Sequence, residues 1–436
     1  MRLHTVPLLV GLLAACQSRA ARPVPANIDG PRRLPTGAML DPVGSSFDVG
    51  AYPFAMVSAP ERDRIVLLLA GFGANGIQVV QTTTGRVLQT VRQPAAFGGL
   101  TFDTARRELY VSGGNRDLIY CYDWRDGAAT LRDSLVLEAR TPRQDGVRYP
   151  AGIALSPDGR RLYVAENLDD SLAVIDLASK RVVQRVAAGR YPYGVVTSPD
   201  GNVYVSTWGS FEVRRWRPGS DGLELVATIH VARHPSAMLL NGDGTRLFVA
   251  SASTDRISVI DPRVNAVVGE LADTVAGSSG EGSTPNALAL SPDGRRLFVA
   301  EADNNAVALF ELGAATAGTT AAAGGDRLLG RIPVQWYPAA LVVQGDTLLV
   351  ANAKGRGDAP NASNGPGPGA GPARVPTDSG YTLGQLRGTV SVIPLAGIDL
   401  ANTSARVARA NGWNREAERA AYPPFAHVIY VIKENR

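Results

Sequence analysis

The sequence has little cysteine and histidine, no Lys/Arg cluster and no long apolar run, and these shortages exclude several classes of protein. Its 436 residues include 2 cysteines and 4 histidines, and the Cys-x-x-Cys-His motif that attaches a haem does not occur. The basic residues, which leave a net charge of +4, are spread along the chain without interleaved aromatic residues, so no nucleic-acid partner is expected. Cys121 lies in an apolar stretch and is predicted to be a small buried strand residue.

The first residues of the chain have the character of a targeting segment. Arg2 is followed by an apolar run from Val6 to Leu13. This run is too short to span a bilayer, for which about 20 residues are needed, but it suits the core of a signal peptide. The residues that end it, Leu13-Ala14-Ala15-Cys16, resemble the lipobox of bacterial lipoproteins, in which cleavage precedes the cysteine. The resemblance implies a signal peptide over residues 1–15, and a plain secretory signal with an incidental cysteine is the alternative.

The same resemblance implies that Cys16 carries the lipid. Several acyl chains on one residue would anchor the chain stably to a membrane. Gln17 resembles the residue that permits sorting to the outer membrane of Gram-negative bacteria, which implies a place in the cell envelope on the periplasmic side of that membrane. Residues 16–43 are rich in Pro, Ala, Gly and Arg and are predicted to form a flexible tether.

One sequence frame recurs along most of the chain. Residues 149–166 and 284–301 share a Pro, an apolar segment, Ser-Pro-Asp-Gly-Arg-Arg and a β-rich segment that ends in Val-Ala-Glu. Weaker copies bring the number of units to seven, and the frames that begin at Pro150 and Pro192 are 42 residues apart. Each unit contains four short β-rich segments and a turn in which Pro sets φ and Gly takes positive φ. This period predicts an all-β, seven-bladed β-propeller of four-stranded blades over residues 44–395.

The last unit lacks a fourth strand of its own. It offers three β-rich segments between residues 340 and 393, whereas the sequence at 46–50 is similar to the outer-strand sequence at 185–189. We therefore expect residues 45–50 to complete the last blade, which would cover an open sheet edge and join the ends of the ring.

The repeated frames point to a known family of repeats. The Tyr-Pro, Ser-Pro-Asp-Gly, Leu-Tyr-Val-Ala and Val-Ile-Asp sequences resemble the YVTN-type β-propeller repeat, which is common in secreted bacterial and archaeal proteins. The resemblance spans roughly residues 45–395 and implies the fold. It implies no single function, because this fold hosts binding modules, lactonases and redox enzymes alike.

Two segments interrupt or follow the repeats. Residues 354–386 are dominated by Gly and Pro and are predicted to form a loop between the second and third strands of the last blade. That loop is either disordered or docks against a further domain. Residues 396–424 contain helix-forming stretches without a strong apolar face, and Tyr422-Pro423-Pro424 would break a helix. This segment is expected to be an interdomain linker.

The last residues, 425–436, have the character of an α/β domain that has only begun. Val428 to Ile432 is a continuous β-rich run, as in a strand buried on both faces of a parallel sheet. Lys433-Glu434-Asn435-Arg436 follows at its carboxyl end, where open α/β sheets bind ligands. A carboxylate and an amide there can offer oxygen ligands to a hard metal cation. A polar tail after a strand is the alternative interpretation.

The segment from His427 to Arg436 resembles the first strand and Glu-Asn-Arg element of the bacterial phosphoesterase family that includes acid phosphatases and phospholipases C. The resemblance implies that Glu434 and Asn435 bind a divalent metal in the complete enzyme, whereas the propeller needs no cofactor. The hydroxyl residue, aromatic residue and Asp that continue the family motif are absent, so no catalytic residue is assigned and this chain alone is expected to be inactive. The expected function is an envelope-anchored binding or accessory module of a metal-dependent phosphoesterase.

Two other functions fit the same sequence. A stand-alone surface lipoprotein would bind a glycan or a protein on one face of the propeller. A lactonase-type propeller would draw its ligands from polar residues that follow second strands, although such residues are more often turn formers: Glu166, Asn167, Glu301 and Asn304. The propeller's two histidines, His230 and His234, flank strand ends and are not assigned to catalysis.

Overall fold

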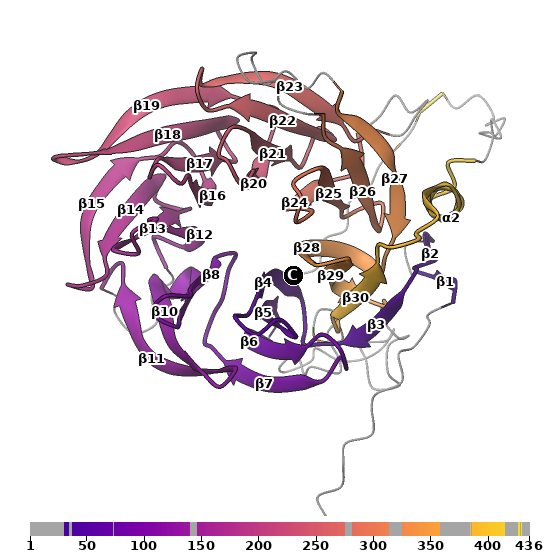
Figure 1. Cartoon of the computed structure of the whole chain (residues 1–436), viewed down its shortest axis with the longest axis horizontal. Helices are drawn as coiled ribbons and strands as arrows, with labels where there is room; N and C mark the ends of the chain where they lie inside the picture. The colour runs from indigo at the N-terminus through magenta and orange to yellow at the C-terminus, as the bar shows by residue number, and fades with distance from the viewer. Residues whose placement is uncertain are drawn as a thin grey trace, which may run out of the picture.

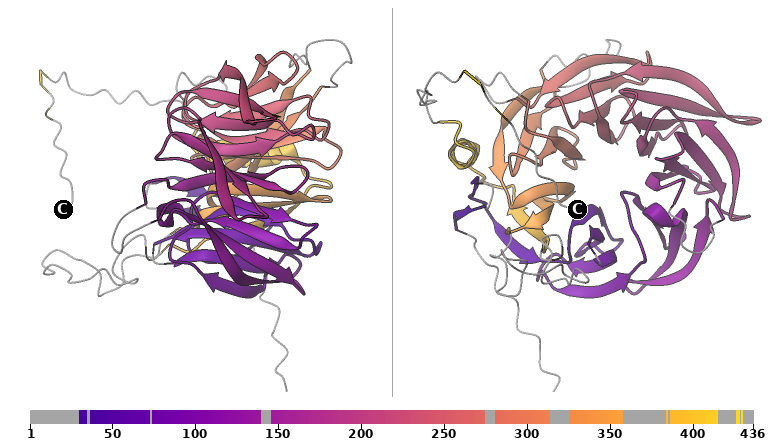
Figure 2. Two further views of the ribbon diagram at one scale, coloured as in Figure 1. Left: turned by 90° about the vertical axis from the view of Figure 1, so that its left-hand side faces the viewer. Right: turned by 180° about the vertical axis from the view of Figure 1, so that it is seen from behind.

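Seven four-stranded antiparallel sheets stand in a ring, which confirms the all-β, seven-bladed propeller (Figure 1). Seen edge-on, the blades form a disc, and the first strand of each blade lies nearest the centre (Figures 1 and 2). The computed structural model describes residues 30–34, 37–72, 74–139, 146–274, 281–313, 325–357, 384, 386–414, 426–427 and 429. Cys16, Glu434 and Asn435 lie outside the described residues, as does most of the predicted α/β segment.

The four strands of each blade follow one another outward from the centre. The innermost strands are β4 (Pro53–Ser58), β8 (Leu100–Asp103), β12 (Pro150–Leu155), β16 (Pro192–Thr197), β20 (Pro235–Leu240), β24 (Pro285–Leu290) and β28 (Trp336–Gln344). The second strands are β5 (Arg64–Gly71), β9 (Glu108–Ser112), β13 (Arg161–Glu166), β17 (Val203–Thr207), β21 (Leu247–Ser251), β25 (Arg296–Glu301) and β29 (Thr347–Gly355). The third strands are β6 (Ala74–Gln81), β10 (Leu118–Arg125), β14 (Ser171–Asp176), β18 (Glu212–Gly219), β22 (Arg256–Asp261), β26 (Ala306–Glu311) and β30 (Thr389–Pro394). The outer strands are β7 (Val87–Arg92), β11 (Ala128–Val136), β15 (Arg181–Ala187), β19 (Gly222–His230), β23 (Ala266–Ala272), β27 (Arg327–Pro333) and β3 (Ser45–Asp48).

The turn between the first and second strands is held by its own side chains. In the third blade, Ser156 Oγ donates to Asp158 Oδ1 (2.6 Å) and accepts from the N–H of Arg161 (2.9 Å). Gly159 takes a φ of +67°, which glycine adopts without steric cost. These turns lie on one face of the disc. We call the opposite face, on which first strands begin and second strands end, the upper face.

The N-terminal strand closes the ring as the sequence predicts. β3 pairs antiparallel with β30 of the seventh blade, with Phe47 opposite Val390. Both side chains are buried in a cluster that also contains Leu349 and Ala351 of β29. The strand covers Ser45–Asp48, slightly less than the expected 45–50. The pairing leaves no free edge on the third strand of this blade.

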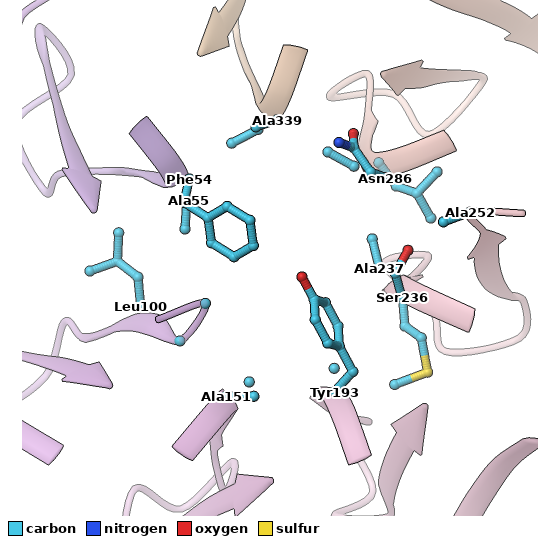
Figure 3. Close-up of a pocket in the computed structure, with 18 of the residues that line it drawn as sticks. Phe54, Ala55, Leu100, Ala151, Tyr193, Ser236, Ala237, Ala252, Asn286 and Ala339 are labelled. Atoms are coloured by element: carbon cyan, nitrogen blue, oxygen red, sulfur yellow. The ribbon is translucent and has the colours of Figure 1, made fainter. Parts of the chain in front are cut away.

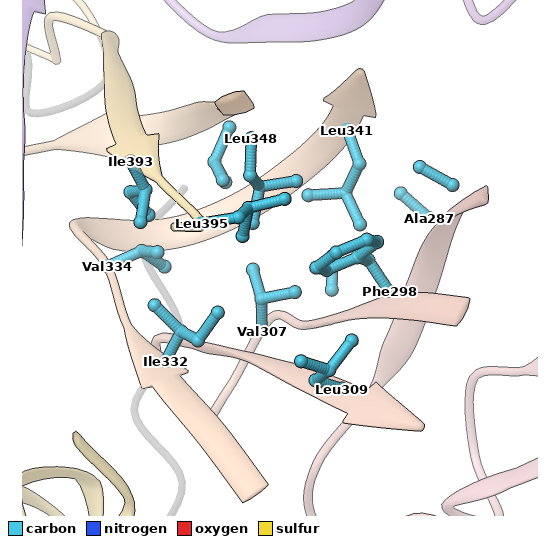
Figure 4. Packing of buried hydrophobic residues seen from close by; sticks show 13 residues of the cluster. Ala287, Phe298, Val307, Leu309, Ile332, Val334, Leu341, Leu348, Ile393 and Leu395 are labelled. Carbon is cyan, nitrogen blue, oxygen red and sulfur yellow. The ribbon is translucent and has the colours of Figure 1, made fainter. Parts of the chain in front are cut away.

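Hydrophobic cores lie between neighbouring blades. The cluster in Figure 4 joins the sixth and seventh blades, with Phe298 and Val307 on one side and Leu341, Leu348 and Ile393 on the other. The second and third strands of these two blades are buried on both faces, because a blade packs against a neighbour on each side. This packing explains why second and third strands are nearly continuous apolar runs.

A polar residue just before the third strand ties several blades to the next one. Four such residues have φ between 48° and 53°: Asp117, Asp170, Asp255 and Asn305. Their side-chain oxygens accept from backbone N–H groups that lead into the next blade, such as Tyr191 N–H to Asp170 (2.8 Å) and Tyr337 N–H to Asn305 (3.0 Å). Asp and Asn tolerate this left-handed conformation because their short side chains bond locally. We call this contact the junction staple.

The segment expected to be a linker contains a helix that packs on the propeller. Helix α2 (Leu400–Ala410) begins with Asp399 as N-cap and buries Val407. It lies against β27 (Figure 1), where Ser404 Oγ accepts from the N–H of Arg331 (2.9 Å) and Arg406 forms an ion pair with Asp41 (2.6 Å). The helix is thus held on the propeller by polar contacts together with a narrow apolar stripe.

Two small elements accompany the blades. A two-stranded hairpin joins β1 (Arg32–Arg33) to β2 (Met39–Leu40), and η1 (Gly114–Arg116) is a 3₁₀ turn in the second blade. Residues 358–383 of the Gly/Pro-rich insert lie outside the described residues. Within the described part of the chain, no helix combines the length and the apolar character that crossing a bilayer requires.

Candidate functional site

One position of the repeat frame faces the centre of the ring in every blade. It is the residue that follows the frame's Pro; in the second blade Phe97 stands in place of this Pro. The residue at this position varies from blade to blade: Phe54, Gly98, Ala151, Tyr193, Ser236, Asn286 and Ala339. Together with neighbouring residues of the innermost strands, these residues line a cavity of about 450 Å³ (Figure 3). A cavity of this size accommodates a small organic ligand.

The cavity has a polar side, formed by consecutive blades. Tyr193, Ser236 and Asn286 come from the fourth, fifth and sixth blades, and the Tyr193 hydroxyl points toward the middle (Figure 3). Burial raises the pKa of Tyr193, so its hydroxyl stays protonated at neutral pH. Asn286 Oδ1 is buried and accepts no hydrogen bond from the described residues. None of the described lining residues is charged, so this polar arc can bind an uncharged polar group.

The other side of the cavity is apolar. Phe54 stacks on Phe97 at 5.5 Å between ring centroids, and Phe97 meets Tyr149 edge-on at 5.1 Å. Tyr52 lies 6.2 Å from Phe54, and burial together with Tyr337 raises the pKa of Tyr52 to about 12. Of these rings only Phe54 and Tyr337 line the cavity, and the others pack behind them.

A second group of aromatic residues lies on the upper face between the fourth and fifth blades. His234 is stacked on Trp208 with 3.8 Å between ring centroids, and Phe211 meets His234 edge-on at 5.4 Å. His234 Nδ1 is 2.6 Å from Ser253 Oγ. Trp208 also lines the cavity, so this group, which we call the rim cluster, is continuous with the polar arc. His230, by contrast, is 3.9 Å from Glu212 at the exposed end of an outer strand.

Two of the residues considered for a lactonase site have structural roles. Glu166 and Glu301 are fully buried. Each forms an ion pair with an arginine of the outer strand, Arg185 at 2.8 Å and Arg331 at 2.6 Å. The carboxylates therefore pair with guanidinium groups of the outer strands and are not among the residues that line the cavity.

The two asparagines of that group also have structural roles, Asn167 in a contact with the next blade and Asn304 in a contact within its own turn. Asn167 Nδ2 donates to the carbonyl of Pro192 (3.0 Å), and Asn304 Nδ2 donates to Glu301 Oε2 (3.0 Å). In the described part of the chain, no three His, Cys, Asp or Glu residues gather in a way that could hold a metal ion. The residues present thus do not fit a metal-dependent lactonase centre in the cavity.

Cys121 is a buried residue of β10, as expected. Burial raises the pKa of its thiol to about 12, which leaves it protonated and unreactive at neutral pH. The ring of cavity-lining residues was not predicted from the sequence. The sequence feature that could have indicated this ring is the variable position x inside an otherwise repeated Pro-x-Gly/Ala frame.

Comparison with known proteins supports the architecture. Residues 126–253 match the family model of the SMP-30/gluconolactonase/LRE-like region. No curated protein matches the sequence.

Among solved structures, the chain is similar to hydrazine synthase of Kuenenia stuttgartiensis, with 19% identity, coverage of 70% of this chain and 94% of that one, and a TM-score of 0.57. It is also similar to a putative 6-phosphogluconolactonase of Bacteroides uniformis (18% identity, 70% and 91% covered, TM-score 0.53). A catalytically inactive virginiamycin B lyase of Staphylococcus aureus gives 12% identity, 80% and 100% covered, and a TM-score of 0.54. Likeness at these identities shows the fold, and the chain is accordingly a β-propeller with an SMP-30/gluconolactonase-like region at residues 126–253.

Proposed function

We propose that this propeller is a non-catalytic binding module, held at the bacterial cell envelope as the N-terminal accessory part of a metal-dependent phosphoesterase. The observation that carries the binding role is the lining of the central cavity. That lining combines aromatic and small apolar residues with Tyr193, Ser236 and Asn286, and none of its described residues is an acid, a histidine, a lysine or a cysteine. Such a site can hold an uncharged ligand but offers no general base, nucleophilic thiol or carboxylate ligand.

The accessory role rests on the resemblance of residues 427–436 to the phosphoesterase family. In the complete enzyme, Glu434 and Asn435 would belong to the metal site, and a divalent metal would polarise the phosphoryl group there. A domain that continues from residue 425 would follow α2, which is fixed to the sixth blade through Ser404 and Arg331 and to the N-terminal segment through Arg406 and Asp41. The propeller would then hold a bound ligand on the same rigid body that carries the start of the catalytic domain.

A lactonase is the second candidate function. The match of residues 126–253 to the SMP-30/gluconolactonase/LRE-like region favours it, as does the likeness to a putative 6-phosphogluconolactonase. Against it, Glu166 and Glu301 are committed to Arg185 and Arg331. The binding role therefore accounts better for the lining of the cavity.

Activity assays on the full chain separate these candidates. We expect no hydrolysis of gluconolactone above the buffer rate with Ca²⁺, Mn²⁺ or Zn²⁺, because the cavity supplies no carboxylate to hold the ion. p-Nitrophenyl phosphate should also remain intact, because Glu434 and Asn435 are too few ligands to clamp the transferring group. Metal-dependent lactone hydrolysis that is lost in Asn286→Ala would overturn the binding role in favour of the lactonase.

The anchor is tested independently of the ligand. Expressed in a Gram-negative host, the full chain should incorporate an alkyne-tagged fatty acid and sediment with outer-membrane vesicles. The Cys16→Ser variant should lose both properties, whereas Cys121→Ser should keep them because Cys121 is buried. Labelling that survives in Cys16→Ser would contradict the anchor.

A further inference from the structure

The junction between the fourth and fifth blades departs from the junction staple. Phe211 occupies the position held by Asp170 and Asp255 in the neighbouring blades, with the same left-handed backbone (φ 59°). Its backbone carbonyl still accepts from Val231 N–H (3.0 Å), but a phenyl ring cannot accept from the N–H of His234. An aromatic residue in place of the staple residue that four other blades carry points to a role other than folding.

The replacement residues present aromatic surface to solvent. Trp208 stands where the third, fifth and sixth blades have Asn167, Ala252 and Ala302, and the side chains of Trp208 and Phe211 are each 37% exposed. His234 lies between them and is held by Ser253. The rings of the rim cluster are therefore held in place by packing before any ligand arrives, which lowers the entropic cost of binding.

The polar arc continues from the rim cluster into the cavity. The Tyr193 hydroxyl can both donate and accept, and the Asn286 amide does so through separate atoms. The Ser236 hydroxyl donates to the Ala250 carbonyl (3.3 Å) and can still accept. Asn286 Oδ1 is a buried acceptor without a donor among the described residues, which costs free energy unless a ligand or solvent supplies one. A ligand that reaches this depth must offer donors and acceptors together.

The absence of charged residues among the described lining residues further restricts the classes of ligand that the site can bind. A phosphate or carboxylate would need a cation in the cavity, and a quaternary ammonium would need an acid or a closed aromatic cage; none of the described lining residues is charged. Arg190 lies 5.1 Å over the ring of Tyr191 beside the rim cluster, which disfavours a cationic ligand there. What fits is an uncharged ring with hydroxyl groups at its edge and C–H groups on its face.

We infer that the rim cluster and the polar arc form one extended site for a neutral sugar chain, an inference that rests on the proposed binding function. One sugar ring stacks its C–H face on Trp208 and Phe211. The next ring extends into the cavity, where its hydroxyls meet Tyr193, Ser236 and Asn286. The site would thus bind a neutral glycan and would not select for the charged groups of lipid or nucleic acid.

Calorimetric titration of the full chain with maltohexaose, cellohexaose and chitohexaose, followed by a neutral glycan array, tests the inference. We expect at least one neutral chain to bind. Trp208→Ala should weaken it about tenfold or more, as loss of a stacked aromatic does. Alanine at this position is compatible with folding, because Ala252 and Ala302 occupy it in other blades. Leu168→Ala, an exposed apolar residue on the same face of the third blade, is the control and should bind as the parent does.

Phe211→Asp gives the sharper result. It should restore the junction staple, raise the melting temperature and still weaken glycan binding, because the stacking surface is lost. Failure of the whole neutral array to bind, or binding unchanged in Trp208→Ala and Asn286→Ala, would overturn the inference. Binding of an uncharged peptide that is lost in the same variants would also overturn it, while leaving the binding module in place. Metal-dependent lactone hydrolysis would instead overturn the proposed function itself.

Discussion

The third and sixth blades carry the same buried ion pair in different surroundings. In the third blade, Glu166 accepts a two-pronged contact from Arg185 (2.8 and 3.1 Å) and a hydrogen bond from the Ser171 hydroxyl (2.6 Å). The Arg185 side chain is 31% exposed. In the sixth blade, Arg331 bonds Glu301 at 2.6 Å and is only 10% exposed. One repeat frame thus places an arginine beside water in one blade and seals it in another.

A second acid lies beside the ion pair of the sixth blade. Asp273, at the end of the fifth blade, contacts Arg331 where Leu137, at the end of the second blade, contacts Arg185. Asp273 is fully buried and lies 3.6 Å from Arg331 Nη2. Neither of its carboxylate oxygens accepts a hydrogen bond from the described residues. Burial, and then the charge of Glu301, hold the pKa of Asp273 well above its usual value. The repeat frame thus fixes the Glu–Arg ion pair, whereas one residue at the end of the preceding blade decides whether the surroundings of that pair are stabilising or destabilising.

Removing the arginines should give the largest effect. Arg331→Met should lower the free energy of unfolding by about 3–5 kcal/mol, because it leaves Glu301 buried without a cation and its neighbour Asp273 without one. Arg185→Met should cost less, because water reaches that site and the Ser171 hydroxyl remains. Urea unfolding at pH 7 of the two variants checks the order. Equal losses would mean that the difference in burial has no energetic consequence.

The second change removes the extra acid beside Arg331, so that the surroundings of the ion pair in the sixth blade resemble those in the third. Asp273→Ala removes a buried carboxyl group whose oxygens accept no hydrogen bond from the described residues and should stabilise the protein by about 1–3 kcal/mol at pH 8. The reciprocal Leu137→Asp should destabilise it by at least as much, because Leu137 bonds Arg185 through its carbonyl as Asp273 bonds Arg331, and the variant buries a second acid beside Glu166 and Arg185. Both variants are measured by urea unfolding, and a loss of stability in Asp273→Ala would contradict the proposed strain.

The same acid should make stability depend on pH. Since the pKa of Asp273 is raised in the folded state, the folded protein binds more protons than the unfolded chain between about pH 4, the unfolded value, and the raised pKa. The contribution of this group is therefore fully present below about pH 4 and is lost as pH rises through the folded pKa. The stability gap between Asp273→Ala and the parent should widen from pH 4.5 to pH 8. A gap that stays constant would show that Asp273 does not titrate in this way.

The sequence predicted the parts of the molecule that depend on local pattern. The Ser156-to-Gly159 turn and the apolar second and third strands repeat with the blade period, so the fold and its closure by β3 could be read from them. The contact between Asp273 and Arg331 could not, because it joins the end of one blade to the outer strand of the next. The cavity ring was also missed, because its members share a place and not a residue type. Residues 396–424 were expected to be a linker because they show no strong apolar face, and among the described residues of α2 only Thr403 and Val407 are buried.

The smallest expected effect on stability concerns Trp413, whose ring lies against Arg331 of the sixth blade. Arg331 lies 5.4 Å from the ring of Trp413, just beyond α2, whereas Arg185 lacks such a ring in its described surroundings. Trp413→Ala should cost about 1 kcal/mol, the size of a partly buried cation–π contact, and should let amide hydrogens of α2 exchange faster. In Arg331→Met the same tryptophan substitution should cost less, because the cation is already gone, and this double-mutant cycle isolates the contact. Additive losses in the two variants would show that Trp413 stabilises the helix without involving Arg331.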